Sequence, residues 1–169
     1  YKHTQSFTII TVKPKIDKLL IQLMNLHPKY IDLSLDRIKA LLSKLGNPHL
    51  NLSPTIHIAG TNGKGSTLSY LKHILNFNGY SVNAYISPHL SKFNERIVLN
   101  NKEVSTRKLL NCLKYVKSVN KSKPITFFEI TTAAAFLLFS KNKADFLILE
   151  TGLGGRLDAT NAIPESLVS

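Results

Sequence analysis

The chain has 169 residues, 43% of them hydrophobic and 19% charged, and 22 Lys and Arg against 10 Asp and Glu give a net charge of +12. These values are ordinary for one globular domain with one hydrophobic core. The single cysteine, Cys112, excludes an internal disulfide. No apolar run approaches the roughly 20 residues that a membrane span needs, so a membrane-spanning protein is excluded as well.

The positive charge suggests anionic partners, yet the lysines are scattered along the chain. The densest stretch, residues 114–123, lacks the aromatic interleaving of a nucleic-acid platform. We therefore expect no nucleic-acid partner and no membrane partner, and a monomer in the cytoplasm, where a lone thiol stays reduced. Cys112 lies in an apolar helical pattern, which predicts a buried structural thiol.

Apolar residues at helical spacing predict two helices near the N-terminus, over residues 15–26 and 34–45. Ser34 is a candidate N-cap for the second, and Gly46 is its expected end. A buried strand then runs over residues 55–59. A glycine-rich turn joins this strand to a helix over 66–78, with an expected apolar stripe of Leu68, Leu71, Ile74 and Leu75.

The rest of the chain again alternates between strand and helix. The pattern predicts a strand at 81–86, a hairpin at 96–104 around Asn100-Asn101, a helix from Ser105 to about 119, a buried helix at 127–139 and a strand at 145–150. Strands separated by helices indicate an α/β fold with a mostly parallel sheet flanked by helices and a small β-hairpin insertion. In such sheets, ligands bind beyond the carboxyl ends of the strands.

Residues 57–67, HIAGTNGKGST, contain the first candidate site. Glycines allow the backbone to approach a phosphate closely, and the N–H groups at the start of the next helix point toward an anion. Lys64 can reach the outer phosphates, and Ser66 or Thr67 can offer a hydroxyl to Mg²⁺. The spacing is two residues shorter than the usual G-x-x-x-x-G-K-[ST] loop, which leaves its chemistry open.

Two further polar residues follow predicted strands. Glu150 closes an apolar strand, where a carboxylate needs a metal ion or a cation, so either a Mg²⁺ site or a salt bridge with Arg156 or a lysine is expected. Ser87 follows the strand at 81–86, where it is either a metal ligand or only part of a turn before Pro88.

Other polar residues carry weaker signals. Glu129, early in a predicted helix, suits a helix N-terminus. The glycine-rich segment 151–161 ends in Asp158, Thr160 and Asn161, which fits both a loop that returns polar groups to the site and an ordinary surface loop. His57 is expected to be a satisfied core or edge residue, whereas the role of His89 stays open.

Four segments in this order, HIAGTNGKGST, SPHLSKFNERI, TFFEITTAAAFLLF and LETGLGGRLDATN, resemble the signatures of folylpolyglutamate synthase and dihydrofolate synthase, members of the Mur ligase superfamily. They span residues 57–161, and YIDLSLDRI at 30–38 also fits. The shortened G-T-N-G-K loop is itself typical of this superfamily. The resemblance implies a P-loop α/β domain similar to the central domain of Mur ligases.

The resemblance also implies an activity, in which ATP phosphorylates a carboxylate of dihydropteroate or a folate and L-glutamate attacks the acyl phosphate. The implied catalytic residues are Lys64 and Glu150, with ATP and Mg²⁺ as cofactors. The residues implied to bind ATP are Gly60, Thr61, Asn62, Gly63, Lys64, Gly65, Ser66 and Thr67. The implied metal ligands are Ser66, Ser87 and Glu150. The residues implied to line the pteroate pocket are Thr126, Phe127, Phe128, Glu129, Leu157, Asp158, Ala159, Ile31 and Asp32.

The chain departs from the family pattern at its end. The resemblance implies one N-terminal ATP-binding domain, with a helical lead-in at 1–54 and a P-loop core at 55–169 that is incomplete at its C-terminus. The resemblance implies that the 169 residues lack the C-terminal domain that completes the glutamate site, so we expect weak or no activity from these residues alone. A non-catalytic or decayed nucleotide-binding fragment and a Mur-type ligase for a cell-wall precursor are the alternatives. The preference between dihydropteroate and folates stays open.

Overall fold

The computed structural model describes residues 15–27 and 34–169 and contains one mixed sheet in the strand order β1-β5-β2-β3-β4. The strands are β1 (Thr55–Ile58), β2 (Val82–Tyr85), β3 (Ile97–Leu99), β4 (Lys102–Glu103) and β5 (Phe146–Glu150). Strands β1, β5 and β2 are parallel, whereas β3 pairs antiparallel with β2 and β4 pairs antiparallel with β3, forming an edge hairpin. The predicted α/β fold with a small hairpin insertion is thereby confirmed.

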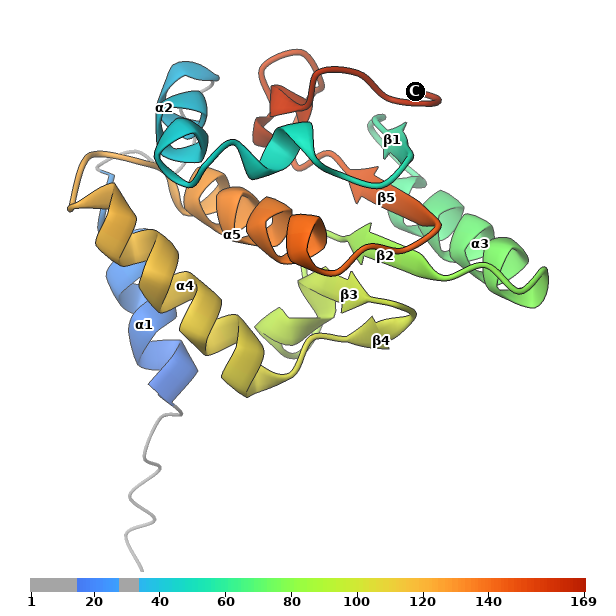
Figure 1. Ribbon diagram of the computed structural model, residues 1–169, viewed down its shortest axis with the longest axis horizontal. Coiled ribbons are helices and arrows are strands. Elements are labelled where there is room, and N and C mark those ends of the chain that lie inside the picture. Colours follow the sequence, from blue (N-terminus) through green and yellow to red (C-terminus); the bar gives the residue numbers. More distant parts are fainter. Residues whose placement is uncertain (1–14, 28–33) are drawn as a thin grey trace, which may run out of the picture.

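Helices cover both faces of this sheet, as Figure 1 shows. The α-helices are α1 (Lys15–Met24), α2 (Asp36–Lys44), α3 (Lys64–Phe77), α4 (Thr106–Asn120) and α5 (Phe127–Lys141). The short 3₁₀ helices are η1 (Pro48–Leu50), η2 (Phe93–Arg96) and η3 (Ala159–Ala162). Helix α5 lies against one face with α1, α2 and α4 packed around it, and α3 packs on β1, β2 and β5 from the other face.

The alternation of side chains along β5 divides the core into two layers. Leu147 and Leu149 belong to the large apolar cluster that contains α5, whereas Ile148 belongs to the smaller cluster beneath α3. Helix α5 is apolar almost all round, which is the composition of a fully enclosed helix. Because successive strand residues face opposite sides, Glu150 shares the α3 face with Ile148.

Local signals fix most element ends. Ser105 Oγ accepts from the N–H of Lys108 and caps α4, as predicted. Asn100 and Asn101 have φ values of 47° and 68°, the left-handed pair that a type I′ hairpin turn requires. Gly46, with φ of 81°, follows the end of α2. The predicted N-cap Ser34 is wrong by one position: the N-cap of α2 is Leu35, whose side chain makes no capping bond, while Ser34 Oγ just before it accepts from the N–H of Asp36 at 3.2 Å.

One expectation about α3 is wrong. Ile74 is 58% exposed, although Leu68, Leu71 and Leu75 face the sheet. At about 100° per residue, Ile74 lies roughly a quarter turn from the centre of that stripe. The helix also begins at Lys64, earlier than expected, because the left-handed Gly63 ends the turn directly before it.

Two further features concern the buried thiol and the sheet edge. Cys112 is buried, its Sγ donates to the carbonyl of Ala134 at 3.4 Å, and burial raises its pKa to about 11, which confirms a structural thiol. The outer edge of β1 pairs with the last residues of the chain: Val168 accepts from His57 and Leu167 donates to Thr55. No helix among residues 15–27 and 34–169 combines the length and apolar character that crossing a membrane requires.

Candidate functional site

The parallel register brings three polar segments to one edge of the sheet. Ile58 pairs with Glu150 at the ends of β1 and β5, and Tyr85 at the end of β2 pairs with Leu149. The chain continues from these ends into the loop 60–63, into Ser87 and into the loop 151–158. The structure therefore brings together the strand ends from which the sequence predicts a site.

The loop after β1, residues 60–63, is exposed and leads directly into α3. Gly63 has φ of 78°, a conformation that side chains other than glycine rarely adopt. Lys64 folds back over the loop, and its Nζ donates to the carbonyl of Gly60 at 2.7 Å. The first N–H groups of α3 have no acceptor within the helix, so this turn can bind an anion.

Glu150 lies beside the start of α3. Its Oε2 accepts from the N–H of Ser87 at 2.9 Å, and its Oε1 is 3.8 Å from the position that a Cβ on Gly65 would occupy. The residue is 4% exposed. Burial raises the pKa of Glu150, while the Ser87 N–H and the charge of Lys64 lower it less.

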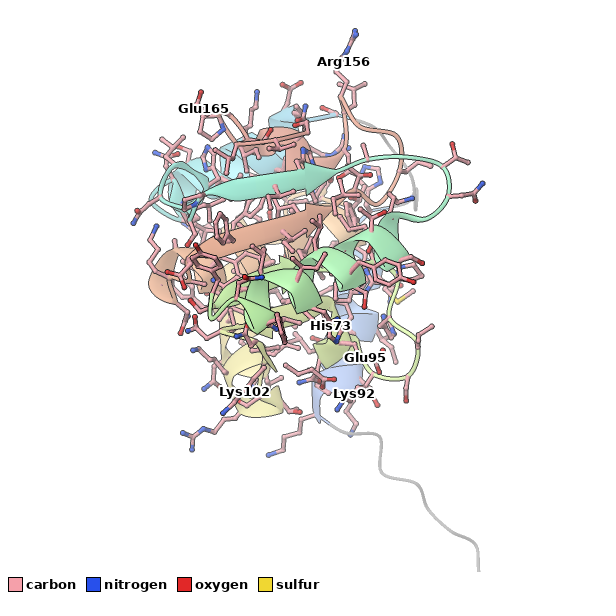
Figure 2. All side chains as sticks on the ribbon, turned by 90° about the vertical axis from the view of Figure 1, so that its right-hand side faces the viewer. His73, Lys92, Glu95, Lys102, Arg156 and Glu165 are labelled. Atoms are coloured by element: carbon pink, nitrogen blue, oxygen red, sulfur yellow. The ribbon has the colours of Figure 1, made fainter. Side chains whose placement is uncertain are left out.

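The salt-bridge alternative for Glu150 is wrong for the part of the chain that the structure describes, where no ion pair joins it to Arg156 or a lysine. Figure 2 shows that the Arg156 side chain points outward from the end of its loop. The carboxylate faces the start of α3 instead. Its remaining oxygen is available there for a ligand.

The donor atoms at this edge suit a hard cation. Residues 15–27 and 34–169 contain no group of three or more His, Cys, Asp or Glu that could hold a metal alone. Mg²⁺ typically uses one or two carboxylates and completes its shell with phosphate oxygens and water. One carboxylate from Glu150, with hydroxyls from Ser66 and Ser87, is a set of this kind, so these residues fit the ion.

Aromatic residues at the start of α5 form a second part of the candidate site. The ring centroids of Phe128 and Tyr85 are 6.0 Å apart, and those of Phe127 and Phe93 are 5.7 Å apart. Phe128 also covers Gly152, since a Cβ added there would lie 2.6 Å from the Phe128 Cζ. The predicted pocket residue Phe128 thus adjoins the loop after β5, whereas Phe127 packs against Phe93.

Glu129, which follows Phe128 in α5, makes structural hydrogen bonds. Its Oε2 accepts from the N–H of Thr126 at 2.7 Å, completing a capping box, and from Arg37 Nε at 3.1 Å. Its Oε1 is buried and has no hydrogen-bond partner among the described residues. The helix-start interpretation of Glu129 is therefore confirmed, and a pocket role remains a prediction.

The loop after β5 is held from inside by Asp158. Its Oδ2 accepts from the N–H groups of Gly152 and Leu153, each at 2.9 Å. Its Oδ1 accepts from Thr160 through both the N–H and the hydroxyl, and the Thr160 hydroxyl accepts from His57 Nε2 at 2.8 Å. The segment is therefore not an ordinary surface loop.

The remaining pocket residues differ in position. Leu157 is exposed on the same loop, and Ala159 is buried at the start of η3. Ile31 and Asp32 lie outside the described residues. His57 is buried and hydrogen-bonded, as expected, and burial lowers its pKa more than the charge of Asp158 raises it.

Sequence reasoning missed Arg96. Its Nε donates to His89 Nδ1 at 2.9 Å, and its guanidinium lies 5.1 Å from the centroid of the Phe93 ring. Burial and the charge of Arg96 lower the pKa of His89. In the sequence, Arg96 opens a hairpin pattern and has no signal of its own, although it lies in one of the segments that carry the family resemblance.

The fold and the groups at its strand ends define an α/β domain with a candidate anion-binding turn. A comparison with models of protein families gives no match. The chain is 42% identical over 136 residues to the dihydrofolate synthetase of Saccharomyces cerevisiae, covering 79% of this chain and 32% of that protein. It is 41% identical over 145 residues to the dihydrofolate synthase/folylpolyglutamate synthase of Escherichia coli, covering 85% of this chain and 34% of that protein.

Solved structures agree. FolC of Escherichia coli in complex with DHPP and ADP superposes with a TM-score of 0.82 and 38% identity, over 88% of this chain and 36% of that one. A Yersinia pestis folylpolyglutamate synthase/dihydrofolate synthase complexed with AMPPNP and Mn gives 0.81 and 36%, over 89% and 37%. Over most of its length, the chain is similar to folylpolyglutamate synthase/dihydrofolate synthase proteins. It spans about a third of the length of these relatives.

Proposed function

We propose that the chain is the ATP-binding part of an amide ligase that joins L-glutamate to dihydropteroate or to folates. One observation carries the proposal: the turn 60–63, Ser87 and Glu150 meet at one sheet edge. Relatives with the same fold support it, since one is in complex with DHPP and ADP, and another with AMPPNP, Mn and L-glutamate.

The chain's own groups would divide the work of holding ATP. The N–H groups between Gly60 and Ser66 would receive the phosphates, and Lys64 Nζ would turn from the Gly60 carbonyl to the outer phosphates. Glu150, Ser87 and Ser66 would hold Mg²⁺, which when bound neutralises phosphate charge and orients the phosphate chain. The rings of Phe127 and Phe128, with residues 157–159, would form the wall for the pteroate.

The proposed reaction would use these positions in two steps. An oxygen of the substrate carboxylate attacks the γ-phosphorus of ATP, the bond to the bridging oxygen breaks and ADP leaves. The amino nitrogen of L-glutamate then attacks the acyl carbon of the acyl phosphate, phosphate departs with the bonding electron pair, and the nitrogen loses a proton to give the amide. The protein contributes alignment and charge neutralisation, which are the main terms in phosphoryl transfer.

Nucleotide binding is tested on the chain itself. We expect Mg²⁺-ATP to bind and Lys64→Ala to weaken it at least about tenfold, because a charge-assisted contact is worth roughly 1.5–3 kcal/mol. Lys72→Ala, which removes the same charge from the same helix farther from the turn, is the matched control. Isothermal titration measures both. Equal binding by the two variants would contradict the assignment of the turn.

Ligation is tested separately by the ATP-dependent incorporation of labelled L-glutamate. Product from dihydropteroate indicates dihydrofolate synthesis, and product from tetrahydrofolate indicates chain extension. Robust product would overturn the expectation of weak activity. ATP binding without any product would favour the alternative, a non-catalytic nucleotide-binding module.

A further inference from the structure

Arg96 brings a positive charge to the candidate site without an acidic partner. Among the described residues, no carboxylate forms an ion pair with it. Its neighbour Glu95 is turned away, since its carboxylate accepts from the N–H groups of Leu90, Ser91 and Lys92. Figure 2 shows Glu95 and Lys92 beside each other on this loop. The nearest acid in the sequence is therefore already used by its own loop.

The backbone of Arg96 fixes its place in the site. Its carbonyl accepts from the N–H of Ile86 at 2.9 Å, one step beyond the pair of Tyr85 with Ile97. Ile86 directly precedes Ser87, whose N–H contacts Glu150. Arg96 consequently lies across the sheet ladder from the segment that carries a predicted metal ligand.

The side chain of Arg96 is oriented by two neighbours. Its Nε donates to His89 Nδ1, and its guanidinium lies over the ring of Phe93. Phe93 in turn packs edge-on against Phe127 of the predicted pteroate wall. A guanidinium has five N–H donors, and the bond to His89 uses only the one on Nε. The four N–H donors on the Nη groups of this half-buried side chain have no acceptor in the described part of the chain.

We propose that Arg96 binds the carboxylate of the pteroyl substrate and holds it for attack on ATP, an inference that rests on the proposed function. A planar guanidinium matches a carboxylate with two parallel hydrogen bonds, and stacking on Phe93 fixes the plane of that fork. A carboxylate and a triphosphate repel each other as they approach, and a cation between Ser87 and Phe127 opposes that repulsion.

The competing explanation is that Arg96 only holds the loop 87–93 through His89 and Phe93. Both explanations predict that loss of the side chain weakens substrate binding. The two explanations differ in whether the effect requires a negatively charged ligand. A carboxylate partner makes the effect depend on the charge of the ligand, whereas a loop anchor affects charged and neutral ligands alike.

The test is a binding cycle on the 169-residue chain, using dihydropteroate and its neutral carboxamide as probes. We expect Arg96→Met to weaken dihydropteroate binding roughly 10- to 100-fold and to leave carboxamide binding unchanged, with Arg96→Lys between wild type and Met. Lys92→Met removes an exposed charge from the same loop and is expected to bind both probes like the wild type. Thermal unfolding of each variant checks that it folds.

The outcomes separate the two proposals. Equal weakening of acid and carboxamide by Arg96→Met, or no weakening at all, overturns the role of Arg96 and leaves the proposed function standing. Failure of the wild-type chain to bind dihydropteroate contradicts the pteroate pocket itself. Preferential loss of acid binding that Arg96→Lys partly restores supports the inference.

Discussion

The loops after β1 and β5 are both rich in glycine, yet they are held in opposite ways. The turn 60–63 is exposed and shaped by its own backbone and by the start of α3, and the Lys64 side chain contacts it at the Gly60 carbonyl. The loop 151–158 closes around a buried carboxylate, Asp158, which is tied through Thr160 to His57 on β1. Glycine content alone therefore does not distinguish an open anion cradle from a loop with a polar core.

This difference predicts how substitutions in each loop should affect ligand binding and folding. Changes in the turn 60–63 should affect ligand binding more than folding, because little of it is buried. Changes around Asp158 should affect folding more than ligand binding, because they leave buried N–H and hydroxyl groups without a hydrogen-bond partner. Four substitutions test this contrast, in order of expected loss of stability.

Asp158→Ala should cost the most, about 3–4 kcal/mol of the free energy of unfolding. The substitution leaves the N–H groups of Gly152, Leu153 and Thr160 without their acceptor, and each stranded group carries a desolvation penalty. Urea unfolding measures the loss. A loss below about 1 kcal/mol would show that the loop does not depend on its carboxylate.

Gly152→Ala should cost about 2 kcal/mol, because the new Cβ would lie 2.6 Å from the Phe128 ring. In a Phe128→Leu background, Gly152→Ala should cost less than it does in the wild type, because the ring that the new Cβ would meet is gone. Gly155→Ala, whose Cβ would meet nothing closer than 3.9 Å, is the control within the same loop. Thermal unfolding of all variants decides between a steric clash and a general effect of alanine.

His57→Gln should cost about 1–2 kcal/mol near pH 8 and also change the pH dependence of stability. Burial lowers the pKa of His57 below its ordinary 6.5, so the unfolded chain binds this proton more readily than the fold does. The contribution is therefore complete above about pH 6.5 and is lost as the pH falls through the lowered pKa. The variant should show a shallower decline of stability in acid than the wild type. An unchanged slope in His57→Gln would contradict this account.

Gly63→Ala should cost only about 1 kcal/mol, the price of a left-handed backbone without any clash. Its effect on Mg²⁺-ATP binding should be larger than its effect on unfolding. The comparison of the two loops fails if Gly63→Ala destabilises the fold as much as Asp158→Ala. Paired unfolding and titration experiments on both variants provide the measurement.

Much of this arrangement follows from local sequence. The Asn100-Asn101 turn and the Ser105 cap depend on residues within four positions, so pattern reasoning places them correctly. The meeting of Ser87 with Glu150 also follows, because parallel strands end at the same edge. These predictions needed only periodicity and the direction of the strands.

Contacts between distant segments could not be predicted in this way. Arg37 reaches Glu129 from 92 residues away, and Arg96 finds His89 only because the chain turns back after Ser87. The inward turn of Asp158 depends on two backbone N–H groups that have no side-chain signal. Such contacts depend on tertiary packing, which the spacing of residue types does not determine.

The pairing of Leu167 and Val168 with the outer edge of β1 bears on how copies of the protein behave in concentrated solution. A bare outer strand offers a row of N–H and C=O groups on which another polypeptide can add as a further strand. The chain occupies part of that row with its own backbone. The strand that leads into the glycine-rich turn 60–63 is thereby shielded from the intermolecular strand addition through which sheet proteins begin to aggregate.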